Sequence, residues 1–191
     1  TFTGRIGDPT GKSQTRVALT EDQIRSNMET YKEQAGKILE IDKCEIRENG
    51  EWLEPMNFAD VLQLAGTFTV SQMLEREMYQ TRMKEGKEIN LVEFLYPLMQ
   101  GYDSVALQSD LELGGTDQLF NNLAGRKIQE KFGMKAQHVL TVPILVGTDG
   151  HEKMSKSLGN YIALNDSATD MFGKTMSIPD DVMMNYFELC T

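Results

Sequence analysis

The longest amphipathic pattern near the start of the chain has helical spacing. Thr20 and Gln23 stand three positions apart, as in a capping box, and therefore predict where this helix begins. Apolar residues then recur every three to four positions, which predicts one amphipathic helix over residues 21–40. Its apolar positions are Ile24, Met28, Tyr31, Ala35, Ile38 and Leu39.

Similar signals predict further helices along the chain. Asn57 and Thr69 are N-cap candidates, and Gly86 and Gly133 are helix-ending glycines. Between the first two helices, the Asn49-Gly50 pair predicts a turn that joins short extended pieces over 44–53. The expected helices cover 58–65, 70–84, 91–102, 117–132, 167–176 and 180–190.

Two apolar runs have the composition of strands. Leu111 to Leu113 reads as the tip of a strand, and Val139 to Val146 as a continuous, buried parallel strand; 161–164 is short and extended. Strand, helix and strand in this order predict an α/β fold with a Rossmann-like, doubly wound parallel sheet, here partial, and a helical insertion. The expected division is 1–56 and 96–165 for the two parts of a nucleotide-binding domain, 57–95 for the insertion, and 166–191 for a final helical segment.

Composition narrows the class of protein. The 191 residues suit one domain with an insertion, and the 40% apolar and 25% charged content is ordinary for a globular protein. No apolar run approaches the roughly 20 residues of a membrane span, and no signal peptide is visible. The net charge of −10 argues against a surface for long nucleic acids, so polyanion chemistry needs local cationic clusters such as Arg5, Lys12 and Arg16. Cys44 and Cys190 are expected to be reduced, buried small residues.

The segment Lys153 to Ser157 is the most informative one. Two lysines three positions apart, interleaved with Met154 and hydroxyls, suit a mobile loop that folds over an anion such as a triphosphate losing pyrophosphate. A solvated surface turn is the alternative for an arbitrary pair of lysines. Of the two histidines, His138 is expected to be structural and His151 at most a minor loop contact; neither has metal-ligand spacing.

A glycine-rich loop opens the chain, with Asp8 beside glycines and Lys12 and Arg16 following. Gly11-Lys12-Ser13 has the ending of a P-loop motif. Position 6, where that motif requires glycine, is Ile6, so the spacing argues against a P-loop NTPase. The structural alternative is a tight Asp-Pro turn. Since no strand precedes the loop, the expectation is an internal fragment whose first strand lies upstream.

Polar side chains share one face of the helix expected after residue 90. Tyr96, Gln100 and Asp103 stand at i, i+4 and i+7, which suits a site for an ammonium at one end and a hydroxyl at the other; an exposed face is the alternative. In Gly114-Gly115-Thr116-Asp117-Gln118, the glycines permit close approach of a ligand. Asp117 could cap the following helix or accept ribose hydroxyls.

These motifs together resemble the bacterial-type tyrosyl-tRNA synthetases, a family of class I aminoacyl-tRNA synthetases. In chain order they are IGDPTGKS, YPLMQGYDS, ELGGTDQ and HEKMSKSLGN. KMSKS indicates the class, and the Tyr96, Gln100, Asp103 stripe points to tyrosine. The resemblance implies that Asp103 meets the phenol hydroxyl. It implies tyrosine contacts from Asp8, Tyr96, Gln100, Asp103 and Gln118; ATP contacts from Gly115, Asp117, Met154 and Lys156; and catalytic roles for Lys12, Arg16, Lys153, Lys156 and Ser157.

The resemblance also implies the reaction. ATP, with Mg²⁺ and without a prosthetic group, activates L-tyrosine to tyrosyl-adenylate, and the tyrosyl group passes to tRNA(Tyr). A cytoplasmic homodimer with contacts over 57–95 is expected, an organelle being the alternative location. The HIGH motif, an upstream tyrosine and an anticodon-binding region are absent from this sequence, so it is expected to be inactive alone. A tryptophan-specific relative and a non-catalytic binding module are the alternative functions.

Overall fold

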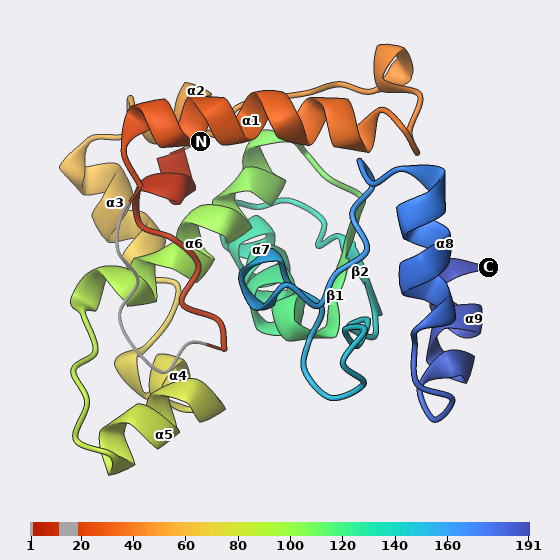
Figure 1. Cartoon of the computed structure of the whole chain (residues 1–191). Coiled ribbons are helices and arrows are strands. Elements are labelled where there is room, and N and C mark those ends of the chain that lie inside the picture. The colour runs from red at the N-terminus through yellow and green to blue at the C-terminus, as the bar shows by residue number, and fades with distance from the viewer. Residues whose placement is uncertain (1, 12–18) are drawn as a thin grey trace. The chain divides into compact units, whose positions relative to one another are not determined.

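The structure is a computed structural model that describes residues 2–11 and 19–191 (Figure 1). The chain forms two compact units. The first comprises Thr1–Thr30 with Glu45–Thr141, and the second comprises Tyr31–Cys44 with Val142–Thr191. The four-part division expected from the sequence stays a prediction.

The elements are mostly helices. In chain order they are η1 (Phe2–Arg5), α1 (Glu21–Ala35), η2 (Ile41–Lys43), α2 (Gly50–Leu53), α3 (Phe58–Ala65), α4 (Val70–Leu74), α5 (Glu77–Lys84), α6 (Leu91–Ala106), β1 (Leu111–Gly115), η3 (Thr116–Gln118), α7 (Leu119–Lys131), β2 (His138–Val142), η4 (Lys156–Leu158), α8 (Ala168–Met176) and α9 (Met183–Cys190).

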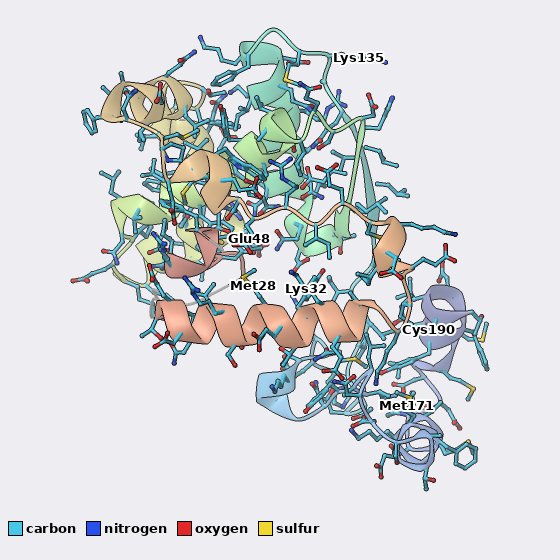
Figure 2. All side chains as sticks on the ribbon, turned by 90° about the horizontal axis from the view of Figure 1, so that it is seen from above. Met28, Lys32, Glu48, Lys135, Met171 and Cys190 are labelled. Atoms are coloured by element: carbon cyan, nitrogen blue, oxygen red, sulfur yellow. The ribbon has the colours of Figure 1, made fainter. Side chains whose placement is uncertain are left out.

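Helix α1 begins as its cap predicts. The Thr20 N–H donates to Gln23 Oε1 at 3.0 Å, and the Gln23 N–H donates to Thr20 Oγ1 at 3.3 Å. Met28 and Lys32 follow one turn apart along it (Figure 2). The helix ends at Ala35 and not at residue 40, because Gly36 follows and glycine is among the poorest helix formers.

Two expectations about short elements are wrong. The Asn49-Gly50 pair does not form a turn between extended pieces: Gly50 begins α2, and the side chain of Asn49 accepts a hydrogen bond from the Phe2 N–H at 2.8 Å. The helix expected over 70–84 is two helices, α4 and α5. Arg76, the N-cap residue of α5, is extended (ψ 130°), which breaks the helical path.

Strands β1 and β2 form a two-stranded parallel sheet. Contrary to the expected buried run, residues of β2 alternate in exposure; Leu140 and Val142 are 55% and 54% exposed. Leu113 of β1 is 68% exposed. Strand β2 ends at Val142 because Pro143 follows and lacks the N–H that a ladder requires.

The core of the first unit lies between α6 and α7. Leu64, Met73, Leu98 and Ile128 form its buried cluster. The two helices approach closely at Gly101, where an added Cβ would lie 2.7 Å from Ile128 Cδ1 and 2.9 Å from the Gly125 nitrogen. This close packing fixes α7 against α6, and α6 carries Tyr96, Gln100 and Asp103 of the predicted tyrosine-binding residues.

The second unit contains both cysteine thiols. Cys44 and Cys190 are free and exposed, so the expectation that they are buried is wrong. Cys190 lies at the end of α9, and Met171 lies on α8 (Figure 2). The Tyr186 hydroxyl donates to the Val146 carbonyl at 2.6 Å, which ties α9 to the segment before the lysine loop. Within the described residues, no helix has the length and apolar character that crossing a bilayer requires.

Candidate active site

Helix α6 carries the polar face that the sequence predicts. It begins after Asn90, whose N–H donates to Glu93 Oε1 at 3.0 Å. It runs through Tyr96, Gln100 and Asp103, all of which are half-buried. The three side chains therefore do not form an exposed helix face, and Gln100 and Asp103 have polar partners within the first unit.

Asp103 is held by two residues that were not predicted as site residues. The Trp52 indole N–H donates to Asp103 Oδ1 at 2.8 Å, and Asn49 Nδ2 donates to Asp103 Oδ2 at 3.2 Å. Asn49 is in turn anchored through Nδ2 to Thr3 Oγ1 at 3.0 Å. Asn49 is the N-cap residue of α2 and Trp52 lies within this helix, a segment over which the sequence predicted a turn between extended pieces.

Burial controls the ionisation of Asp103. It raises the pKa of this carboxyl from 3.8 to about 6, and the hydrogen bonds from Trp52 and Asn49 oppose the rise. The carboxylate of Glu112, on β1, adds to the rise by like-charge repulsion. Burial also raises the pKa of Glu112 itself. A carboxylate with this pKa is ionised at neutral pH and yet poorly hydrated, so it accepts a hydroxyl hydrogen bond strongly.

Asp8 and Gln118 meet, although 110 positions separate them. Asp8 Oδ1 accepts from the Thr10 N–H at 2.9 Å, which is the tight Asp-Pro turn considered as the structural alternative. Its second oxygen, Oδ2, accepts from Gln118 Nε2 at 2.8 Å. The turn and the contact with another predicted site residue therefore coexist in one side chain.

Asn121 joins this pair to α6. Its Nδ2 lies 3.1 Å from Gln118 Oε1, 3.1 Å from Gln100 Oε1 and 3.4 Å from Thr10 Oγ1. The structure thus brings Asp8, Gln100 and Gln118 into one hydrogen-bonded cluster. Asn121 was not predicted as a site residue, and its place three residues after Gln118 is the only signal in the sequence.

Arg76, from the helical insertion, reaches the same cluster. Its Nη2 donates to Thr10 Oγ1 at 2.9 Å, and its guanidinium lies 4.5 Å from the centre of the Phe120 ring. Burial lowers the pKa of Arg76, whereas the nearby charge of Asp8 raises it. A cation therefore stands beside the Asp8 turn, a contact that the sequence analysis missed.

The Gly114 to Gln118 segment is β1 running through η3 into α7. At Gly114 an added Cβ would lie 2.5 Å from Asn122 Nδ2, so a larger residue would require the buried Asn122 side chain to shift. Asp117 lies within η3 and is half-buried. Helix α7 starts at Leu119, two residues later than predicted, with Gln118 as its N-cap residue.

The lysine loop belongs to the second unit. Val146 and Lys153 form an isolated antiparallel bridge, so the chain turns back tightly between them. Asn160, only 5% exposed, holds this loop: its Oδ1 accepts from the Ser155 N–H at 2.9 Å and its Nδ2 donates to the Lys153 carbonyl at 3.2 Å. Gly147 packs so close to the Asn160 side chain that only glycine fits there.

The remaining predicted residues of the lysine loop differ in exposure. Lys153 and Lys156 are exposed, and Met154 is half-buried. Ser157 lies within η4. Lys12 and Arg16, the predicted cations of the first loop, lie outside the described residues.

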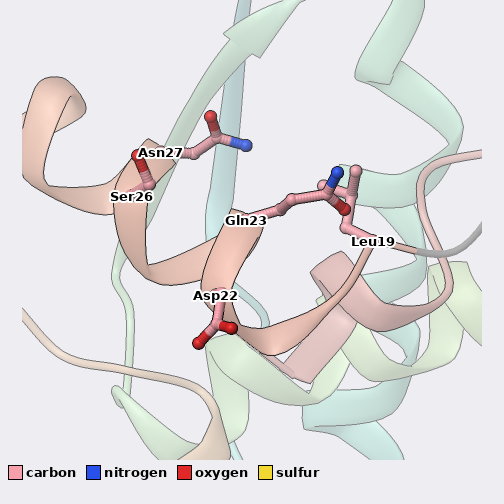
Figure 3. A pocket seen from close by; sticks show the side chains of 5 residues that line it. All are labelled: Leu19, Asp22, Gln23, Ser26 and Asn27. Carbon is pink, nitrogen blue, oxygen red and sulfur yellow. The ribbon is translucent and has the colours of Figure 1, made fainter.

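Other features do not add to this site. A hollow along the first turns of α1 contains none of the predicted site residues (Figure 3); its lining residues are Leu19, Asp22, Gln23, Ser26 and Asn27. In residues 2–11 and 19–191 no group of three or more His, Cys, Asp or Glu side chains could hold a metal ion. His138 starts β2, where its backbone N–H donates to the Asp110 carbonyl at 2.8 Å.

The fold and these motifs define a class of protein. The family model for class I tRNA synthetases of the W and Y types matches residues 1–191, and the chain belongs to this family. The tyrosine–tRNA ligase of Thermotoga maritima is 58% identical over 190 residues, which are 100% of this chain and 47% of that protein. The tyrosine–tRNA ligase of Moorella thermoacetica is 55% identical over 190 residues, which are 100% of this chain and 46% of that protein. The chain therefore spans about half the length of these curated relatives.

Solved structures agree with the fold. The tyrosyl-tRNA synthetase from Archaeoglobus fulgidus, complexed with L-tyrosine, superimposes with a TM-score of 0.65 at 27% identity, over 84% of this chain and 50% of that one. The C-terminally truncated mitochondrial tyrosyl-tRNA synthetase of Aspergillus nidulans superimposes with a TM-score of 0.67 at 23% identity, over 99% of this chain and 60% of that one. This likeness bears on the fold alone. The predicted Rossmann-like α/β class is confirmed.

Proposed function

We propose that the protein containing this chain activates L-tyrosine with ATP and transfers the tyrosyl group to tRNA(Tyr). The observation that carries the proposal is the half-buried carboxylate of Asp103, which lies on the same helix as Gln100. Trp52 and Asn49, from another segment, hold it in place. A half-buried carboxylate with a free lone pair suits the hydroxyl of a phenol, a donor that phenylalanine lacks. The curated relatives named tyrosine–tRNA ligase support the same substrate.

The tyrosine site in this proposal lies in the first unit. Asp103 accepts the phenol hydrogen bond at one end of the α6 face. Asp8, Tyr96 and Gln100 hold the α-ammonium group at the other end, with Gln118 lining the same site. The hydrogen-bonded cluster of Asp8, Gln118 and Gln100 supports this assignment, since carboxylate and amide oxygens are the acceptors that an ammonium requires.

ATP is assigned to backbone and loop groups. Gly115 and Asp117 meet the ribose and adenosine, and Met154 and Lys156 contact the nucleotide. Mg²⁺ would accompany the triphosphate in this proposal and would help to neutralise its charge. Lys12, Arg16, Lys153, Lys156 and Ser157 form the cationic and hydroxyl groups that stabilise the departing pyrophosphate.

The first chemical step needs no general base. The tyrosine carboxylate is already a nucleophile; it attacks the α-phosphate in line, the new C–O–P linkage forms, and the bond to pyrophosphate breaks. Catalysis is then positioning and charge stabilisation. We expect Lys153→Ala or Lys156→Ala to lower the adenylation rate about a hundredfold, the value of one well-placed donor, with little change in tyrosine affinity. Pre-steady-state rates within twofold of wild type would reject these roles.

The test of function is amino-acid-dependent exchange of pyrophosphate into ATP. It uses the polypeptide that contains this chain at the length of its relatives, with tyrosine, phenylalanine and tryptophan each supplied alone. We expect exchange with tyrosine and charging of tRNA(Tyr). Exchange with tryptophan only would support the other type that the family model covers. No exchange with any amino acid would favour a non-catalytic binding module.

We also propose a homodimer with contacts through residues 57–95. Large apolar side chains of α3 to α6 are exposed in the single chain: Phe58 is 76%, Leu62 57%, Val70 62%, Met83 53% and Leu91 75% exposed. Light scattering should give twice the chain mass, and Phe58→Asp should reduce it to one chain.

The free, exposed thiols Cys44 and Cys190 fit a reducing compartment, and we place the protein in the cytoplasm.

A further inference from the structure

Asn121 is the most buried member of the cluster around Asp8. It is 1% exposed and lies in the first turn of α7. Its partners come from separate segments: Thr10 from the opening loop, Gln100 from α6 and Gln118 from η3. Its own Oδ1 is buried without a hydrogen-bond partner among the described residues. Such a stranded acceptor costs stability, so packing alone does not explain an asparagine here.

The chemistry of the Asn121 amide restricts its neighbours. An amide nitrogen donates two hydrogen bonds and accepts none, so it pairs only with oxygens. Both of its shortest contacts, 3.1 Å each, are to the side-chain oxygens of Gln100 and Gln118. The oxygen and nitrogen of a glutamine amide have nearly the same size, so sterics alone do not prevent a 180° flip. Asn121 opposes the flip electrostatically from the oxygen side of both amides. On the nitrogen side, Asp8 Oδ2 accepts from Gln118 Nε2 at 2.8 Å and Asn122 Oδ1 accepts from Gln100 Nε2 at 3.3 Å.

The orientation of these amides decides what a ligand meets. With its oxygen on Asn121, Gln118 directs its NH₂ group to Asp8 Oδ2 at 2.8 Å, which holds that carboxylate in place. Gln100 Oε1 faces the cluster and accepts from Asn121. The second lone pair of this oxygen can accept a further hydrogen bond from a ligand. If Gln100 flipped, an NH₂ group would replace that oxygen and would repel a cation. If Gln118 flipped, its oxygen would face Asp8 Oδ2 and would repel that carboxylate.

We infer that Asn121 is a positioning residue: it sets the amide orientations of Gln100 and Gln118 and thereby makes the cluster selective for an ammonium group. The inference rests on the proposed tyrosine site. Asn121 acts through these glutamines, and it needs no contact of its own with the substrate.

The experiment compares two ligands of the full-length protein. L-tyrosine carries the ammonium, and 3-(4-hydroxyphenyl)propanoate has the same phenol and carboxylate but no amino group. Dissociation constants for both are measured by equilibrium dialysis for wild type, Asn121→Ala and Asn121→Asp. The aspartate has nearly the same volume but offers only acceptors, so it favours the flipped glutamines. We expect both variants to raise the dissociation constant of tyrosine about tenfold or more. The dissociation constant of the analogue should change less than about twofold.

A buried amide on the same helix gives the matched control. Gln129 is 0% exposed and donates to the carbonyls of Ser104 and Ser109, away from the cluster. Gln129→Ala should lower the melting temperature and leave the ratio of the two dissociation constants as in wild type. If Asn121→Asp binds tyrosine as wild type does, or if both Asn121 variants lose the two ligands equally, this inference is overturned. If wild type binds neither ligand, the proposed function fails and this inference fails with it.

Discussion

Trp52→Phe isolates the hydrogen bond that most directly holds Asp103. The substitution keeps an aromatic ring but removes the indole N–H, which lies 2.8 Å from Asp103 Oδ1. A hydrogen bond to a charged group contributes about 1.5–3 kcal/mol. Since 1.36 kcal/mol corresponds to one pKa unit, the loss raises the pKa of Asp103 above its value of about 6 by roughly one unit or more. The carboxyl is then substantially protonated at pH 7.

The proposed function turns this shift into a change of specificity. A neutral carboxyl accepts a phenol hydrogen bond less well, and it is stranded at a lower cost when phenylalanine binds. We expect the ratio of kcat/KM for tyrosine over phenylalanine to fall about tenfold at pH 7, the effect of about 1.4 kcal/mol. The acid limb of the tyrosine kcat/KM profile should move about one pH unit toward alkaline pH.

Pyrophosphate exchange between pH 5.5 and 8.5, with each amino acid, measures both quantities in the full-length protein. Arg47→Met is the matched control, because the Arg47 guanidinium lies over the Trp52 ring, 5.8 Å from its centre, without contributing the N–H. That variant should keep the wild-type profile. A Trp52→Phe variant whose specificity ratio stays within twofold of wild type, with an unmoved acid limb, would refute the reasoning.

Further predictions concern stability. Arg82→Ala should cost about 3–5 kcal/mol in chemical denaturation, because it strands the buried Glu93, which Arg82 binds at 2.6 Å and 3.0 Å; replacing both by apolar residues should cost far less. Gly101→Ala should cost about 1–3 kcal/mol, since its Cβ would meet Ile128 at 2.7 Å, and an unchanged midpoint would contradict the close packing. Burial raises the pKa of Asp103 from 3.8 to about 6, so the native state binds a proton that the unfolded state releases, and stability should fall by up to about 3 kcal/mol as pH rises through that window. Asp103→Asn should lack this fall when unfolding is measured at pH 4 and pH 7.

Local signals predicted where helices begin when capping chemistry was explicit. Thr20 with Gln23, Asn57 with Asp60, and Thr69 with Gln72 all form reciprocal caps, because these bonds involve residues three positions apart. Predictions failed where a distant partner competed with local preference. Asn49-Gly50 favours a hairpin turn by itself, but the Asn49 side chain bonds Phe2 and Thr3, 47 and 46 positions away.

The sequence alone determined which groups are available and in what order. The α6 face of Tyr96, Gln100 and Asp103 follows from helical periodicity, and the family follows from motifs along the chain. Only tertiary structure decided which groups surround them. Trp52 reaches Asp103 across 51 positions, and Gln118 reaches Asp8 across 110. Such contacts depend on how α6 packs against α7 and on the burial that moves the pKa of Asp103, and neither has a local signature in the chain.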